Sequence, residues 1–514
     1  MNLNKFRPFL NRYWILLVLV IIKLVLQFVL VNPVYELHRD EFLHLDQAFH
    51  PSAGYISVPP FSSWIAGIIY LLGGGLFWIR LFPALFGALT IIFTWLIVEE
   101  TGGRLPAKIL ASVFLIFSVL VRMNVLFQPN SFDILIWTIL FYLLIRYFKE
   151  QQVKWLMLLA IMTALGLYNK YTVLFLLTGL FAGLMLTLAR RIFTGKGIYI
   201  ALAFCLILFL PNIIWQIKNH FPVIHHMNAL NNSQLVNVSR ADFLLDQFRY
   251  GLAGILTLAA LWAFVFYKPF KSYRFIGWTF IAVIVLFTIS RAKSYYTIGL
   301  YPVLFAFGSV YLETIFKRWK VVLITLLAVM NIVIFFSVVK YLMPFQNPSE
   351  IIKNREAYER MGLLRWEDGK DHLLPQDFAD MMGWREMSEK ALQAYRMVPG
   401  NELENTLIYC DNYGQTGALN YYNRTKMPEA YSFNTDYIYW LPKFKEIRNI
   451  VFVGDLPDKD VTDMFTEIKL VGIIENEHAR ENGTQIYLLL GADPGFTRWF
   501  YKTAEERKMT YNIF

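Results

Sequence analysis

A polar stretch at residues 38–61, HRDEFLHLDQAFHPSAGYISVPPF, directly follows an apolar run that is long enough to cross a bilayer. Its two adjacent acids, Asp40 and Glu41, are candidate catalytic groups, because a carboxylate can accept the proton of an attacking hydroxyl group. They also suit the amino end of a short helix over 41–50, where negative charge is favoured by the helix dipole. A third candidate is Asp133 in QPNSFD, just inside an apolar run, where ionisable groups are costly and usually functional. These three acids could meet in one pocket.

Basic side chains stand at the ends of apolar runs and in the turns between them. A carboxylate surrounded by cations suits a reaction on an anionic lipid, because the cations would hold a phosphate while the carboxylate takes up a proton. The alternative is that they snorkel to the lipid headgroups, which fits Lys170 and Lys293 less well because both are flanked by Tyr in tight turns. The residues concerned are Arg39, Arg80, Arg122, Lys170, Lys218, Arg291 and Lys293.

Histidines and one tryptophan add two further hypotheses. His38 and His225, together with Asp40 and Glu41, are candidate ligands of a divalent metal ion, although their spacing alone does not bring them together. No other cofactor is indicated, and no nucleotide-binding motif is present. Trp215 in LPNIIWQIKNHF is either an anchor at the membrane interface or part of the wall of a site for a lipid or sugar.

The composition indicates a membrane protein. Of the 514 residues 56% are hydrophobic, above the value of about 45–50% that is typical of soluble domains. Residues 1–349 carry a net charge of +17 and residues 350–514 a net charge of −7. Lys and Arg collect in cytoplasmic loops of membrane proteins, so the basic half is expected to hold the spans. No basic stripe lies outside loops and span ends, and nucleic acid is therefore excluded as a partner.

Eleven apolar runs are predicted to span the membrane. With the amino terminus in the cytoplasm, the basic loops that follow are cytoplasmic as well, provided that the Gly-rich segment 60–76 does not cross. This segment and the one at 41–50 are therefore predicted to be interfacial or re-entrant helices. An even number of spans with a cytoplasmic tail is the alternative. The predicted spans are 12–31, 80–98, 107–121, 132–148, 154–168, 171–189, 198–214, 250–266, 275–290, 297–314 and 321–341.

The predicted organisation is a polytopic all-α transmembrane domain, residues 1–344, followed by a soluble α/β domain, residues 345–514, outside the cytoplasm. Glu99, Glu100, Glu150 and Glu313 are expected at cytoplasmic span ends, in solvent. Predicted strands are TLIYC, EAYSF, NIVFVG, LVGIIE and TQIYLLL, and predicted helices are GQTGALNYY and KDVTDMFTEI. The protein is accordingly placed in the plasma or inner membrane, with its site and carboxyl-terminal domain extracytoplasmic.

Taken together, these residues resemble the polyprenyl-phosphate-sugar-dependent glycosyltransferases with the membrane-embedded C-type fold. That superfamily includes the protein O-mannosyltransferases and the aminoarabinose transferases that modify lipid A, and the resemblance is greatest to its bacterial family-39-like branch. It covers roughly residues 12–314. The motifs that carry it are Asp40-Glu41, Gly54-Tyr55 with Pro59-Pro60, RLFP at 80–83, QPNSFD ending at Asp133, Lys170-Tyr171, Pro211-Asn212 with Trp215, and Lys293-Ser294-Tyr295-Tyr296.

The resemblance implies roles for these residues. Asp40 would be the catalytic base, with Glu41 and Asp133 beside it. The lipid phosphate would be bound by Lys293, Lys170, Arg80 and Tyr296, and the substrate would contact Trp215, Asn212 and Tyr55. The short helices after Asp40-Glu41 and Pro59-Pro60 would lie flat on the membrane.

The expected activity is transfer of a hexose or pentose from a polyprenyl-phosphate-linked donor in the membrane to an acceptor hydroxyl of a glycan, lipid or protein. A single displacement predicts inversion at the anomeric carbon. Two alternatives remain open. A transporter or flippase of polyprenyl-linked lipids would use the same cations without a base, but many transporters carry internal repeats and none is evident here. An envelope scaffold with a binding domain would leave Asp133 unexplained.

Overall fold

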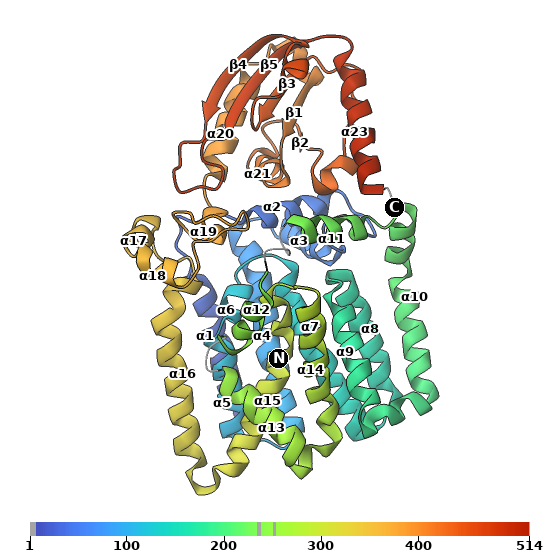
Figure 1. Ribbon diagram of the computed structural model, residues 1–514, viewed down its shortest axis with the longest axis vertical. Coiled ribbons are helices and arrows are strands. Elements are labelled where there is room, and N and C mark those ends of the chain that lie inside the picture. Colours follow the sequence, from blue (N-terminus) through green and yellow to red (C-terminus); the bar gives the residue numbers. More distant parts are fainter. Residues whose placement is uncertain (1–6, 234–237, 250–252, 513–514) are drawn as a thin grey trace. The chain divides into compact units, whose positions relative to one another are not determined.

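The computed structural model describes residues 7–233, 238–249 and 253–512 (Figure 1). The chain divides into two compact units, each built from several segments. The helical unit comprises Met1–Val31, Phe77–Ile213 and Asn232–Phe345. The mixed unit comprises Asn32–Leu76, Ile214–Asn231 and Gln346–Phe514. The predicted boundary at 344/345 thus lies where the chain enters the mixed unit for the last time, and two earlier segments also belong to that unit.

The helical unit is built from long apolar helices (Figure 1). Seven helical stretches in the described part of the chain are long and apolar enough to cross a membrane, or up to eight if the bent pair Thr172–Met185 and Leu188–Thr194 counts as one span. This is a multi-pass membrane protein. Its helices are α1 (Arg7–Val29), α4 (Leu76–Glu100), α5 (Leu105–Ile116), α6 (Leu120–Met123), α7 (Pro129–Glu150), α8 (Val153–Asn169), α9 (Thr172–Met185), α10 (Lys196–Lys218), α12 (Arg240–Arg249), α13 (Ala253–Phe266), α14 (Arg274–Ile289), α15 (Tyr301–Ile315) and α16 (Lys320–Leu342).

Each of the eleven predicted spans contains a helix, but six of these helices are shorter than 18 residues: α5, α8, α9, α13, α14 and α15 have 12, 17, 14, 14, 16 and 15 residues. A preceding 3-10 helix extends the stretches of α14 and α15 to 22 residues each. Two predicted spans are interrupted by hydroxyl side chains that cap the backbone. α5 ends at Ile116, and the Ser118 hydroxyl then accepts a hydrogen bond from the backbone N–H of Leu120. α9 ends at Met185, and Thr187 caps the following 3-10 helix, which is bent by 106° from it. Apolar composition does not reveal such breaks, because Ser and Thr are tolerated within apolar runs.

Charged side chains gather at one end of the helical unit. Glu99 pairs with Arg12 and Lys108, and Glu100 pairs with Arg146 and Lys149. Asp133 and Glu150 lie near opposite ends of α7, whose 22 residues span about 33 Å. The sequence assigned these glutamates to one side of the membrane and Asp133 to the other, and within this unit the two sets are separated in that way. Which end faces the cytoplasm stays a prediction.

The mixed unit contains a five-stranded sheet with strand order β2-β1-β3-β5-β4 (Figure 1). β1 runs parallel to β2 and β3, whereas β5 runs antiparallel to β3 and β4. All five predicted strands are confirmed, and so is the α/β character of this part. The strands are β1 (Thr406–Cys410), β2 (Ala430–Tyr431), β3 (Asn449–Val453), β4 (Phe465–Ile473) and β5 (Gln485–Ala492), and the longer helices of the carboxyl-terminal segment are α20 (Trp384–Arg396), α21 (Tyr413–Asn423) and α23 (Phe496–Asn512).

One predicted helix of the mixed unit was wrong over most of its length. The stretch KDVTDMFTEI forms a helix, α22, only over Lys459–Thr462, and from Phe465 the chain is strand β4. β4 pairs with β5 from Phe465 to Ile473, and most of its side chains are exposed. A strand with so many exposed positions lacks a continuous buried face, so the alternation of apolar and polar residues that predicts a strand is weak in this sequence.

The short helix α2 (Arg39–Asp46) is a core element of the mixed unit, and its predicted position flat on a membrane stays a prediction. Its residues from Glu41 to Asp46 are all buried. Phe42 is fully buried and contacts the rings of Trp384, Tyr421 and Tyr422. A Cβ on Gly417 in α21 would come within 2.8 Å of the Phe42 Cβ, so glycine permits this close packing. The sequence did not show that a segment some 370 residues later covers α2.

The next short helix, α3 (Phe61–Leu71), has the two-sided character of an interfacial helix. Phe61, Ala66 and Ile69 are buried, while Trp64 and Ile68 are among its exposed apolar residues. With 11 residues it is about 17 Å long, too short to span a bilayer.

Candidate functional site

The amino end of α2 distinguishes the two adjacent acids of the polar stretch. His38 is the N-cap: its Nδ1 accepts a hydrogen bond of 3.2 Å from the backbone N–H of Asp40. Glu41 completes a capping box, because its carboxylate accepts a hydrogen bond of 2.7 Å from the backbone N–H of His38. Glu41 is completely buried, whereas 36% of the Asp40 side chain is exposed. Of the two acids, Asp40 is therefore the one that solvent and a substrate can reach.

Two side chains in the mixed unit hold the Asp40 carboxylate. The Tyr413 hydroxyl, at the first residue of α21, donates a hydrogen bond of 2.6 Å to Asp40 Oδ1. The Arg39 guanidinium lies 3.6 Å from the same oxygen and over the Tyr413 ring. Burial by itself would raise the pKa of Asp40, but the nearby His38 and Arg39 and the hydrogen bond from Tyr413 outweigh it and hold the pKa well below its usual range. Asp40 is thus ionised at neutral pH.

The histidines predicted as metal ligands have other surroundings. His38 Nδ1 lies at the helix N-cap, 3.2 Å from the backbone nitrogen of Asp40, and its Nε2 lies 3.7 Å from Asp380 Oδ2. His225 lies half-buried in α11 (Pro222–Ser233). Within the described residues, no three His, Cys, Asp or Glu side chains are grouped so that they could hold a metal ion. The donor set for a divalent metal therefore does not fit, and no step is assigned to one.

Three predicted motifs converge at one end of the helical unit. The turn between α8 and α9 is tied to the start of α7, because Asn169 Nδ2 donates to the Pro129 carbonyl over 2.9 Å. Next to it, Lys170 Nζ donates to Asn130 Oδ1 over 2.7 Å. The Lys170 ammonium group also lies 4.2 Å from the ring centre of Tyr296. QPNSFD, LYNKYT and SRAKSYYT thus form one cluster, in which a half-buried lysine lies against an aromatic face.

Asp133 fixes the helices of this cluster. Its Oδ1 accepts a hydrogen bond of 3.0 Å from Trp137 Nε1, and its Oδ2 accepts one of 2.9 Å from the Thr172 hydroxyl. The side chain is 7% exposed and so joins α7 to the first residue of α9. Asp40 belongs to the mixed unit and Asp133 to the helical unit, so their meeting in one pocket stays a prediction.

Three further residues that were predicted to bind the substrate or its phosphate also belong to the helical unit. Asn212, buried in α10, accepts a hydrogen bond of 2.9 Å at Oδ1 from the Tyr171 hydroxyl. Lys293 is half-buried and immediately precedes the 3-10 helix Ser294–Leu300 that carries Tyr296. Arg80, in α4, is 7% exposed and donates from Nη1 to the Val125 carbonyl over 3.1 Å.

Lys23 is a buried cation that the sequence analysis did not single out. It lies in α1, is 1% exposed and donates to Gln27 Oε1. Gln27 in turn donates to the Val121 carbonyl, close to the segment that Arg80 contacts. The signal was present in the sequence, because Lys23 is the lone charged residue between Arg12 and Val31, and a charge within a span is a candidate functional residue.

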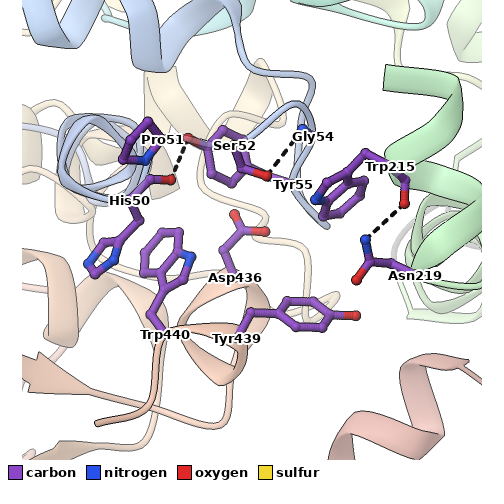
Figure 2. A pocket seen from close by; sticks show the side chains of 10 residues that line it. All are labelled: His50, Pro51, Ser52, Gly54, Tyr55, Trp215, Asn219, Asp436, Tyr439 and Trp440. Carbon is purple, nitrogen blue, oxygen red and sulfur yellow. Dashed lines mark hydrogen bonds between the residues drawn. The ribbon is translucent and has the colours of Figure 1, made fainter. Parts of the chain in front are cut away.

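Tyr55 and Trp215 line one pocket in the mixed unit (Figure 2). Its volume is about 330 Å³. Tyr55 is buried, and its hydroxyl lies within hydrogen-bonding distance of the carbonyl oxygens of Gln47 and His50. The pocket is lined by His50, Pro51, Ser52, Gly54, Tyr55, Trp215, Asn219, Asp436, Tyr439 and Trp440.

Comparisons with known proteins agree with these motifs. Residues 57–215 match the sequence profile of the family described as dolichyl-phosphate-mannose-protein mannosyltransferase. No curated protein matches the chain. Among solved structures, ArnT from Cupriavidus metallidurans in the apo state has 14% sequence identity and a TM-score of 0.59, with 93% of this chain and 98% of that one covered. The structure of the same protein bound to undecaprenyl phosphate gives the same values.

A weaker match covers 82% of this chain and 65% of the archaeal oligosaccharyltransferase AglB from Archaeoglobus fulgidus, solved with an inhibitory peptide and a dolichol-phosphate, at 12% identity and a TM-score of 0.48. The likeness to ArnT shows a shared fold over nearly the whole chain. This shared fold and the profile match over residues 57–215 together confirm the resemblance that the sequence motifs indicated.

Proposed function

We propose that this protein is a membrane glycosyltransferase that moves a sugar from a polyprenyl-phosphate-linked donor to an acceptor hydroxyl on the extracytoplasmic side of the membrane. The observation that carries the proposal is the Lys170 cluster. Asn130 and the Tyr296 ring hold a half-buried ammonium group at one end of a bundle of apolar helices, which suits the phosphate of a lipid whose chain lies in the membrane. The match of residues 57–215 to a polyprenyl-type mannosyltransferase profile supports the same donor class.

Cations are needed because the leaving group is anionic. As the bond between the anomeric carbon and the phosphate oxygen breaks, negative charge grows on the polyprenyl phosphate, and preorganised cations stabilise it. Lys170 and Lys293 are half-buried and can supply this charge, and the ring of Tyr296 lies against the Lys170 ammonium group. The phosphate already activates the sugar, so the reaction requires no nucleotide.

Asp40 serves as the base in this proposal. Its lowered pKa keeps it ionised, and its exposed surface gives an acceptor hydroxyl access. A weakly basic carboxylate accepts the proton late, when attack on the anomeric carbon has made the hydroxyl more acidic. Glu41 is fully buried, and its hydrogen bond to the His38 backbone N–H fixes the end of α2 from which Asp40 projects. One carboxylate at the reacting carbon is consistent with a single displacement and inversion.

The full-length protein, purified in detergent, tests the proposal when it is incubated with radiolabelled polyprenyl-phosphate-mannose, -glucose and -galactose and an envelope extract as acceptor. We expect one donor to release polyprenyl phosphate while its sugar becomes attached to the acceptor with inverted anomeric configuration. An assay in proteoliposomes tests the alternative. If intact donor lipid moves between the leaflets and no sugar is transferred, the protein is a transporter.

Replacement of Lys170 by Gln is expected to raise the KM for the donor and to lower kcat, with kcat/KM falling about 10- to 100-fold. The reason is that a hydrogen bond to a charged group contributes about 1.5–3 kcal/mol. Steady-state kinetics on the released polyprenyl phosphate measures this effect. Lys154→Gln is the matched control, because Lys154 is 58% exposed and pairs with Glu150 at the other end of α7. Equal kinetics of the two variants would remove Lys170 from the phosphate site.

Replacement of Tyr413 by Phe is expected to shift the acidic limb of the pH profile of kcat/KM upward by about one unit. The hydroxyl donates to the ionised Asp40, so its loss destabilises the charged form and raises the pKa. Because Asp40 must be ionised to act, activity is then lost at a higher pH. Tyr422→Phe is the matched control, since Tyr422 donates to the Glu36 carboxylate over 2.8 Å in the same unit. A parallel shift in both variants would exclude a specific effect on Asp40.

A further inference from the structure

The pocket of the mixed unit has walls that suit one class of ligand. Trp215 and Tyr439 meet edge to face with ring centres 6.5 Å apart, and Trp440 meets Tyr55 in the same way at 6.2 Å. Trp215, Tyr439 and Trp440 are half-buried, so each ring keeps part of its surface exposed. Figure 2 shows Trp440 and His50 on one side of Asp436 and Trp215 on the other. Aromatic surfaces at a polar opening suit a ring that is apolar on its faces and hydroxylated at its rim.

The charged groups of the pocket are committed to the protein itself. Asp436 is buried, and its Oδ1 accepts hydrogen bonds from the backbone N–H groups of Ile56 and Ser57, at 2.5 and 3.4 Å. Its Oδ2 accepts from the Ser57 hydroxyl at 2.6 Å and from Gln47 Nε2 at 2.9 Å. A carboxylate has about four acceptor sites, and these four hydrogen bonds occupy them. Asp436 therefore shapes the loop at 56–57 and has little capacity left for a cationic ligand.

His50 is committed in a similar way. Its Nε2 lies 2.5 Å from Glu429 Oε1, and its ring stacks on Trp440 with centres 4.1 Å apart and planes 6° from parallel. The stack holds the Trp440 indole in place. A ligand would thus meet the amide of Asn219 and the hydroxyl of Ser52 as uncharged polar groups, together with the aromatic surfaces. The fixed negative charge of Asp436 also disfavours a phosphate.

We propose that this pocket is a binding subsite for a neutral saccharide ring, stacked on Trp440 or Trp215. It deepens the proposed function, because the sugar would belong either to the donor or to an acceptor glycan. Phosphate recognition is left to the helical unit, and the mixed unit recognises the carbohydrate itself. The volume of about 330 Å³ lies at the lower end of the usual range for small-molecule sites, about 300–1,000 Å³, and so limits the subsite to a small part of a glycan.

Saturation-transfer NMR tests the subsite without requiring turnover. The probes are methyl mannoside, methyl glucoside and methyl galactoside, with glucosamine and glucose 6-phosphate as charged comparators, added to the full-length protein in a detergent that has no sugar headgroup. We expect transfer to the ring protons of at least one neutral probe. We expect its affinity to fall about tenfold in Trp440→Ala and in Trp215→Ala, because each removes a stacking surface.

Trp366→Ala is the matched control, because Trp366 also stacks on a histidine, His372 at 3.7 Å, and does not line the pocket. Trp440→Ala could impair folding, because the Trp440 ring contacts His50, Tyr55 and Tyr437. Trp215→Ala is the second variant, because among the described lining residues the Trp215 ring contacts Tyr439 alone. The proposal is overturned if no neutral probe receives saturation from the protein, or if a charged comparator binds more tightly than every neutral probe. It is also overturned if Trp440→Ala, Trp215→Ala and Trp366→Ala lose affinity equally.

Competition then identifies the source of the sugar. Displacement of the neutral probe by a polyprenyl-phosphate-sugar assigns the subsite to the donor, and displacement by an isolated envelope glycan assigns it to the acceptor. Binding of a neutral probe by a protein that transfers no sugar would sustain the subsite while the proposed function fails. Enzymatic transfer of sugar by a protein that binds no neutral probe would sustain the proposed function while the subsite fails.

Discussion

Replacement of Asp40 by Asn is expected to lower kcat for sugar transfer about a thousandfold while the donor still binds. General-base catalysis contributes about 10²- to 10⁴-fold, and an amide cannot accept the proton. The asparagine has the same shape, and its carbonyl oxygen can still accept the hydrogen bond from Tyr413, so the fold of the α2 end is expected to persist. Single-turnover measurement of released polyprenyl phosphate, with donor binding measured in parallel, separates the two effects.

Two comparisons sharpen this experiment. Asp368→Asn removes an exposed carboxylate of the same unit and is expected to leave kcat unchanged. Glu41→Gln is expected to cost much less than Asp40→Asn, because a glutamine at this position can still complete the capping box. An Asp40→Asn variant with wild-type kcat would contradict the role of base, and a Glu41→Gln variant that is equally inactive would extend it to both acids.

Replacement of Gly308 by Ala is expected to lower the free energy of unfolding by about 2–3 kcal/mol. Gly308 lies in α15 where this helix crosses α13, and an added Cβ would lie 2.1 Å from the Leu256 carbonyl oxygen. Backbone atoms of a neighbouring helix cannot rotate away as a side chain can, so the two helices must separate. Thermal or SDS-induced unfolding of the full-length protein in detergent measures the loss.

Gly254→Ala is the matched control in α13, because no atom outside its own stretch of helix lies within 4 Å of a Cβ built there. The same change at that position is expected to be neutral or slightly stabilising, since alanine favours a helix by about 0.5–1 kcal/mol over glycine. Equal stability of the two variants would show that α13 and α15 are not in close contact at Gly308.

The sequence predicted most of the helix positions in the helical unit and which of its polar residues lie at the same end. Apolar runs located a helix in each predicted span, and the alternation of basic loops separated Glu99 and Glu100 from Asp133. This works because a bilayer imposes length and charge rules on each segment independently of the rest of the chain. Motif order also brought Lys170, Tyr296 and Asn212 into one neighbourhood as expected.

The surroundings of Asp40 and of the pocket required the tertiary structure. Tyr413, Trp440 and Asp436 contact residues 39–57 from positions more than 370 residues away in sequence. The burial of α2 and the commitment of Glu41 to the helix cap followed from the same packing. Local patterns report only what a residue does relative to its near neighbours. Whether a carboxylate is exposed, capped or charged depends on side chains that folding brings to it from distant parts of the chain.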